Sequence, residues 1–364
     1  MSVLPPRTAR IPTNDIYPPD HRQSVRLGYV RCCAFEEAAM RSPERPSARA
    51  LSNVAAARLL GYLILEVSST EGRETLSREI TSCVDDVKLW DLGEFTQIRL
   101  IGTFKKYSNS KSAVPSDHPS RQSFDGITEQ YSTIIQETPL SHTDAKDLAL
   151  IRDGFRCAFT ELYDDRLERY DLEEWNRLDQ AHGPLLMTNT ELAHILPQKI
   201  NRNLGTEAKL QYASSIWAVL GRFGNHAHIG EAFSGDHINQ LSNVMTMSPD
   251  AHDRFGRLQI WLEEREGEPH VYDVKTYAHS PAQFRVNNVV RFTATDGRTH
   301  LLPDPALIKL HSTCARVAHL SGAGEELDRL YRDCESIKQI SGPQKAPTIE
   351  SDKLFHALQL ALVR

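Results

Sequence analysis

Several histidines of this sequence are candidates for acid-base or metal chemistry. The segment ELAHILPQ, residues 191–198, places His194 between an alanine and a short apolar run that a proline ends. A neutral imidazole takes a proton from water near physiological pH and is also a common metal ligand. A single histidine on an apolar segment is more often structural. Residues elsewhere in the chain are therefore needed to distinguish a catalytic base from a core histidine at position 194.

Other candidates favour structural roles. In GNHAHIGEAF, His226 and His228 have a spacing that suits zinc on a strand, but no cysteine or carboxylate follows at ligand spacing, which favours a loop. The six cysteines contain no CxxC pair, so they indicate free, mostly buried thiols. Among them, Cys157 has no base near it in the sequence that would make it a nucleophile.

Two further pairs of residues have the same ambiguity. Lys199 and Arg202 follow a proline and are able to contact a phosphate, although a solubilising surface role is favoured. His311 and His319 are eight residues apart on a predicted helix, so they share roughly one face, and core packing is the ordinary explanation.

The composition indicates a water-soluble globular protein. The 364 residues are 40% hydrophobic, enough for two domains with sizeable cores. The longest apolar stretches, such as residues 59–67, are too short to span a bilayer, and no signal peptide is recognised, so we expect an intracellular, cytoplasmic protein without membrane contact. Because the net charge is -6, a nucleic-acid partner would require a local basic patch.

Element signals divide the first part of the chain into three. Residues 1–49 are rich in proline and predict a loop-like arm with one short helix at Phe35 to Met40. Residues 50–107 have apolar residues at three- and four-residue spacing and predict a helical domain. The polar stretch 108–143 lacks periodicity and predicts a linker.

Residues 144–300 predict a mixed domain. A helix is expected to run into a strand at Phe155 to Thr160, followed by an acidic insertion, residues 161–180, that reads as a solvated helical face. Ser248 and Pro249 are typical of a helix start, with a strand near residues 258–263 after it.

The remaining signals complete an α+β protein. Alternating segments between residues 269 and 302 predict hairpin strands with TDG as the turn. Residues 301–364 predict closing helices.

Four segments in order resemble the fungal HNH-endonuclease-like proteins. They are RDGFRCAFT, ELAHILP, NVMTMSPDAHDRFGRLQIWLEE and LPDPALIKLHSTCARVAHLSGAGEELD, and the similarity covers most of residues 147–336. The resemblance implies an HNH-like ββα finger embedded in a mainly helical protein. In this family two strands and a helix hold one divalent cation, and a histidine deprotonates the attacking water.

The resemblance also assigns roles to single residues. His194 matches the general base, Asn243 the residue that ties the finger loop and helps to orient the base, and His252 a metal ligand on the helix. Two other ligand positions hold Ala193 and Gly256, which cannot coordinate a metal.

Two carboxylates near these positions are possible replacements for the lost ligands. Asp253 points about 100° away from His252 on a helix. Glu191 shares a strand face with Ala193 only if no bulge intervenes.

Three functions follow from this pattern. The missing ligands favour an enzyme that has kept the scaffold without the metal and promotes ring formation of the Diels-Alder type on a small apolar molecule, as the resemblance to fungal natural-product proteins allows, with no cofactor. The alternatives are a nuclease that uses Mg²⁺ or Zn²⁺ on nucleic acid, and a non-catalytic binding protein. The helices of residues 50–107 either cover a pocket on the finger or form a homodimer contact.

Overall fold

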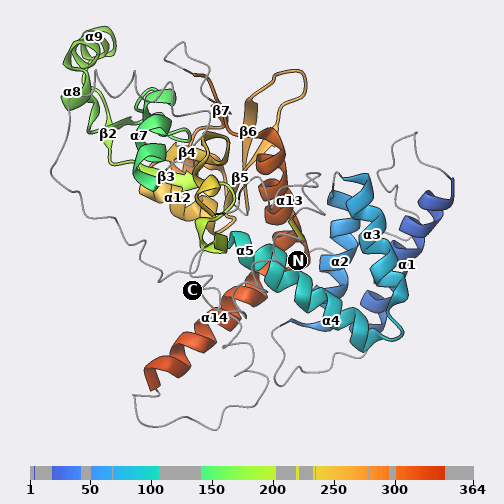
Figure 1. Cartoon of the computed structure of the whole chain (residues 1–364). Coiled ribbons are helices and arrows are strands. Elements are labelled where there is room, and N and C mark those ends of the chain that lie inside the picture. Colours follow the sequence, from blue (N-terminus) through green and yellow to red (C-terminus); the bar gives the residue numbers. More distant parts are fainter. Residues whose placement is uncertain are drawn as a thin grey trace. The chain divides into compact units, whose positions relative to one another are not determined.

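The protein is mostly helical with small sheets, as expected for an α+β fold (Figure 1). The computed structural model describes residues 4, 19–41, 51–67, 69–105, 141–201, 219–220, 233, 235–277, 279–294 and 301–340. The chain forms two compact units, which are described separately: the first contains residues 1–107, 197–231 and 309–364, and the second contains residues 108–196 and 232–308. Among the described helices, none has the length and apolarity needed to cross a membrane.

The first unit is a set of helices. Their bounds are α1 (Pro19–Arg41), α2 (Asn53–Glu66), α3 (Thr70–Ser82), α4 (Asp86–Thr96), the π-helix η1 (Gln97–Ile101), α5 (Gly102–Phe104), α13 (Pro305–Ser321), which enters this unit at residue 309, and α14 (Ala323–Ile340). Side-chain caps start the helices: Ser52, Ser69 and Asp85 each accept a hydrogen bond from the first turn of α2, α3 and α4. Helix α1 packs on α2 and α3.

Helix α1 corrects the expectation of a loop-like arm over residues 19–41. No proline lies inside this helix after Pro19, which occupies its first position, where a missing N–H costs nothing. From there Val25, Tyr29 and Cys32 recur at helical spacing and are buried. Their burial stabilises a helix over a stretch that we expected to be helical only at Phe35 to Met40.

The second unit combines short helices with three small sheets. Its elements are α7 (His142–Arg152), β1 (Tyr163–Asp164), α8 (Leu167–Tyr170), α9 (Leu172–His182), β2 (Met187–Thr188), β3 (Glu191–His194), η3 (Gly235–Asn239), η4 (Leu241–Asn243), β4 (Val244–Met247), α12 (Pro249–Gly256), β5 (Ile260–Glu264), β6 (Val271–Thr276), η5 (Pro281–Phe284) and β7 (Val289–Arg291). The short helix η2 (Gln198–Asn201) belongs to the first unit.

Strands β3 and β4 and helix α12 form a ββα finger. The two strands are antiparallel, with Glu191 opposite Met247 and His194 opposite Val244, and the pairing has no bulge. Helix α12 begins as the sequence predicts, with the Ser248 hydroxyl as cap and Pro249 in the first turn. It packs on β3.

The sheet β5-β6-β7 follows the finger and is antiparallel. Strand β5 confirms the strand expected near residues 258–263, and β6 and β7 confirm two of the hairpin strands. The TDG turn lies outside the described residues, as do most of residues 207–224 and all of 341–364.

The strand expected at Phe155 to Thr160 is wrong. Gly154 and Phe155 have φ angles of 62° and 56°, in the left-handed region, so the chain turns as soon as α7 ends. Only an isolated bridge joins Arg156 to Tyr163. The apolar run that suggested a strand is instead a packed turn, since Phe159 is fully buried.

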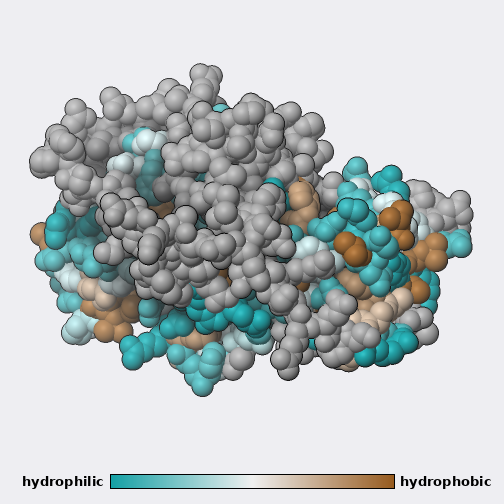
Figure 2. All heavy atoms as spheres, turned by 90° about the horizontal axis from the view of Figure 1, so that it is seen from below, coloured by the Kyte–Doolittle hydropathy of each residue, from teal (hydrophilic) through white to brown (hydrophobic). Residues whose placement is uncertain are grey.

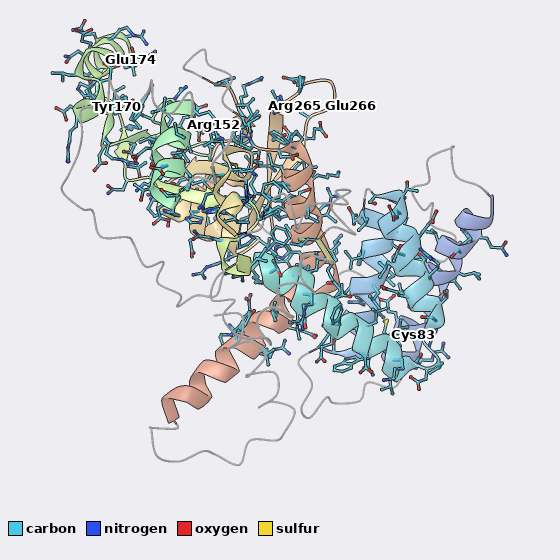
Figure 3. The ribbon with its side chains drawn as sticks, in the orientation of Figure 1. Cys83, Arg152, Tyr170, Glu174, Arg265 and Glu266 are labelled. Carbon is cyan, nitrogen blue, oxygen red and sulfur yellow. The ribbon has the colours of Figure 1, made fainter. Side chains whose placement is uncertain are left out.

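The acidic insertion forms α8 and α9, whose charged residues are solvated as expected, whereas Trp175 and Leu178 pack against a buried cluster that includes Leu150. No residue of α9 is fully buried, and Asp171 caps it while Arg177 pairs with Glu174 on its surface. Figure 3 shows Glu174 on α9, at the outer end of the insertion, away from Arg152. The described surface seen in Figure 2 is mainly hydrophilic, with small hydrophobic patches.

Candidate functional site

His194 is the last residue of β3 and is held by an amide. Its Nε2 lies 2.9 Å from Oδ1 of Asn239, which comes from η3 and is buried. Because an amide oxygen only accepts, Nε2 is the donor in this contact. His194 is therefore a partly exposed imidazole held at Nε2 by a buried amide.

Asn243 ties together the chain on either side of the finger loop. Its Oδ1 accepts from the N–H of Leu196 at 2.8 Å, and its Nδ2 donates to the carbonyls of Leu196 at 3.1 Å and Ile238 at 2.8 Å. The side chain is fully buried. These bonds connect the segment that follows His194 with the segment that carries Asn239. Asn243 thus fixes the two chain segments that define the His194 ring.

His252 lies on α12 and is joined to β3 by a carboxylate. Its Nδ1 is 2.6 Å from Oε2 of Glu191, and both side chains are partly exposed. Since β3 has no bulge, Glu191 and Ala193 share one face of the strand, the condition that the sequence left open. Glu191 therefore stands beside the one histidine for which the resemblance implies a metal.

Ala193 and Gly256, at the two expected ligand positions, have no side chain that binds a metal. Ala193 is fully buried, and Gly256 is the last residue of α12. Asp253 points away from Glu191 and pairs with Arg257 at 2.8 Å, one turn further along. Among the described residues, no three His, Cys, Asp or Glu side chains gather as a metal site.

Glu191 and His252 nonetheless fit a divalent cation. Because Nδ1 of His252 is bonded to the Glu191 carboxylate, Nε2 is the ring atom that would bind the cation, and Glu191 would hold the ring in place, as carboxylates do for metal-bound histidines. Water and phosphate oxygens would supply the remaining positions, as they commonly do for Mg²⁺. Both side chains retain solvent exposure, 37% for Glu191 and 20% for His252, so a phosphate can approach them.

Arg152 and Asp153, at the end of α7, bind the backbone of the finger. Neither residue was singled out from the sequence. The Arg152 guanidinium is fully buried and donates to the carbonyls of Leu241, Val244 and Leu301. It also forms a bidentate pair with Asp153, at 2.7 and 3.0 Å. The only signal was the dipeptide at the start of RDGFRCAFT.

Asp153 also binds the second strand of the finger. Its Oδ2 accepts from the N–H of Thr246 in β4 at 2.9 Å. Because Arg152 contacts the carbonyls on both sides of Asn243, at Leu241 and Val244, the pair fixes the backbone that carries that residue. Figure 3 labels Arg152 in this part of the unit.

The other candidates from the sequence do not join this site. His311 and His319 are buried, and His311 packs edge-on against Phe104, which confirms a core role. The expectation that Lys199 solubilises the surface is wrong: its Nζ donates to the carbonyls of Gly102 and Lys105, so it caps the end of α5.

Four further candidate residues remain. Cys157 is buried, and its sulfur accepts from the N–H of Ser248 at 3.1 Å, a contact that packs the start of α12. His226, His228 and Arg202 lie outside the described residues.

Comparison with known proteins identifies the finger. Residues 157–263 match the HNH endonuclease family. The matched segment contains β3, β4 and α12, and with them His194, Asn243 and His252, to which the resemblance assigns the three letters of the HNH motif. The HNH segment is a minority of the chain, and no curated protein or solved structure matched.

Proposed function

We propose that the chain is a metal-dependent HNH endonuclease that hydrolyses phosphodiester bonds, with His194 as base and with Glu191 and His252 as the residues that hold the cation. The proposal rests on the 2.6 Å pair between Glu191 and His252 within the matched HNH segment. The carboxylate would fix the ring of His252, the remaining ligand beside positions 193 and 256, where Ala193 and Gly256 replace ligands. The proposal thus reverses our preference for a metal-free enzyme.

The chemistry required of the protein is modest. His194 takes a proton from water at Nδ1 while the water oxygen bonds to phosphorus and the bond to the leaving sugar oxygen breaks. A bound cation polarises the phosphate and stabilises the charge that forms on the leaving oxygen. Asn239 accepts a hydrogen bond from Nε2 of His194. In the neutral ring this bond leaves the lone pair at Nδ1.

Plasmid cleavage tests the proposal. Chelator-treated protein is incubated with supercoiled DNA and Mg²⁺, Mn²⁺ or Zn²⁺, and wild type is compared with His194→Ala and His252→Ala. We expect metal-dependent nicking that falls by about 10² to 10⁴-fold in His194→Ala, the range for a lost general base. His182→Ala, at the exposed end of α9, is the matched control and should nick like wild type. Folded wild-type protein that neither nicks DNA nor binds these ions contradicts the proposal.

The other functions inferred from the sequence stay predictions. Ring formation on a small apolar molecule and non-catalytic binding both require a pocket for the ligand, and the described contacts around His194 are polar, through Asn239 and a second imidazole. An intracellular location and a homodimer are likewise untested predictions.

A further inference from the structure

A second imidazole lies against His194. The rings of His142 and His194 have their centroids 5.9 Å apart and their planes inclined by 27°. This is an offset, nearly parallel arrangement of the kind that aromatic rings favour. The two residues are 52 positions apart in the chain (194 minus 142), so only the fold brings them together.

The backbone of His142 is fixed with respect to β3. His142 is the first residue of α7, and the Ser141 hydroxyl caps that helix by accepting from Asp144 N–H. One face of α7 is locked into a core with the finger. That core contains Ala145, Leu148, Ala149, Leu192, Leu241 and Val244. Leu192 and Val244 belong to the strands themselves, so α7 and the finger act as one packed body.

Two of the contacts of the His194 ring come from different elements. Asn239 binds one ring edge at Nε2, and the His142 ring lies offset against one ring face. A hydrogen bond at a single atom leaves the ring free to tilt about that atom, whereas contact with a ring face resists the tilt. A catalytic base has to be held within about 0.5 Å and 10–20° of its working geometry.

We infer that His142 is a positioning residue for His194: its ring holds the imidazole of the base in the plane in which Nδ1 meets the attacking water. The inference rests on the proposed function for its consequence in catalysis, but the ring geometry itself is measurable without any activity. A ring contact is the requirement, so phenylalanine should replace His142 and an aliphatic residue should not.

The test compares His142→Ala, His142→Phe and the control His182→Ala. Ring signals of His194 in ¹⁵N-histidine-labelled protein, assigned with His194→Gln, report its tautomer and its mobility. We expect wild type and His142→Phe to show the Nε2–H form with sharp signals, and His142→Ala to show mixed tautomers or broadening. Unchanged His194 signals in folded His142→Ala overturn the inference.

Kinetics provide the second readout. In single-turnover nicking we expect His142→Ala to lose about tenfold to a hundredfold in rate with nearly unchanged KM, the scale for a misplaced catalytic group, and His142→Phe to recover most of it. Rate loss in both variants with unchanged ring signals means that His142 does not act by stacking and overturns the inference. If wild type does not nick DNA, the proposed function fails while the ring signals still decide the role of His142. If His142→Ala does not fold, His142→Gln replaces it, because glutamine is a good helix former and has no ring.

Discussion

The carboxylate of Glu191 and the imidazole of His252 join the first strand of the finger to its helix, with 2.6 Å between Oε2 and Nδ1. The two residues are far apart in the sequence and belong to different secondary-structure elements. The bond exists because Glu191 is two residues before Ala193 on an unbulged strand, which turns it towards α12.

Removing the charge of Glu191 should weaken cation binding without unfolding the finger. Glu191→Gln keeps the shape and loses the negative charge, so we expect the affinity for Mg²⁺ or Mn²⁺ to fall about 10 to 100-fold, as for other carboxylates that support a metal site. Calorimetric titration of chelator-treated protein measures it. Asp253→Asn is the control, because Asp253 pairs with Arg257 instead. Equal losses of cation affinity in both variants would show that the affinity depends on overall negative charge and not on Glu191 itself.

Asn243→Ala should destabilise the second unit. The change leaves the N–H and carbonyl of Leu196 and the carbonyl of Ile238 without a side-chain partner in a buried place. With about 1–3 kcal/mol for a buried group left unsatisfied, we expect a loss of about 3 kcal/mol in the free energy of unfolding. Urea denaturation followed by fluorescence measures the loss, and Asn243→Asp, which places a carboxylate oxygen against the carbonyls of Leu196 and Ile238, should lose at least as much at neutral pH. A change below about 0.5 kcal/mol would show that the tie carries little stability.

Arg152→Met should be more damaging than any surface arginine change. It removes the donors to three backbone carbonyls and leaves Asp153 buried without its partner. Breaking a buried ion pair from one side costs about 3–5 kcal/mol. The same denaturation measurement applies, with Arg169→Met on the exposed side of α8 as control. If the two variants unfold at the same urea concentration, the buried interactions of Arg152 are not a source of stability.

Lys199 should give the first unit a measurable pH dependence. Desolvation lowers the pKa of Lys199 from 10.5 to about 8. Between these values the unfolded chain binds more protons than the folded chain, so stability rises with pH, by up to about 1.4 kcal/mol per pH unit. Below about pH 8 both states are protonated and the contribution is flat.

The comparison with Lys199→Met isolates this effect. Other lysines and tyrosines titrate in both proteins and cancel in the difference. We expect the free energy of unfolding of wild type, relative to the variant, to rise between pH 8 and 10 and to stay level between pH 6 and 7.5. A flat difference up to pH 10 would mean that the carbonyls of Gly102 and Lys105 keep the pKa near its ordinary value.

The resemblance implied the finger, and a local signal predicted where its helix begins. Ser248 and Pro249 mark the start of α12 through cap chemistry, and the spacing from Asn243 to His252 then places the second histidine on that helix. The helix α1 escaped prediction for an equally local reason, since the prolines up to Pro19 suggested a loop for residues that follow them.

The partners of the site residues were not predictable in the same way. Glu191 faces His252 only because β3 pairs with β4 without a bulge, a property of two strands together. Asn239 and His142 reach His194 from separate elements, and nothing in their neighbourhoods marks them. Arg152 did carry a signal, the RD dipeptide, but its meaning lies in carbonyls about 90 to 150 residues later.

The parallel pair β1 and β2 joins the start of the acidic insertion to the strand that follows it, with Tyr163 beside Met187 and Asp164 beside Thr188. Asp164 is bonded to Thr190, so the base of the insertion is anchored directly ahead of β3. Residues 165–186 leave and return at one place. They are not an independent loop, because Trp175 and Leu178 pack against a buried cluster that includes Leu150 of α7. A change in the apolar face of the insertion would therefore reach the helix that packs on the finger.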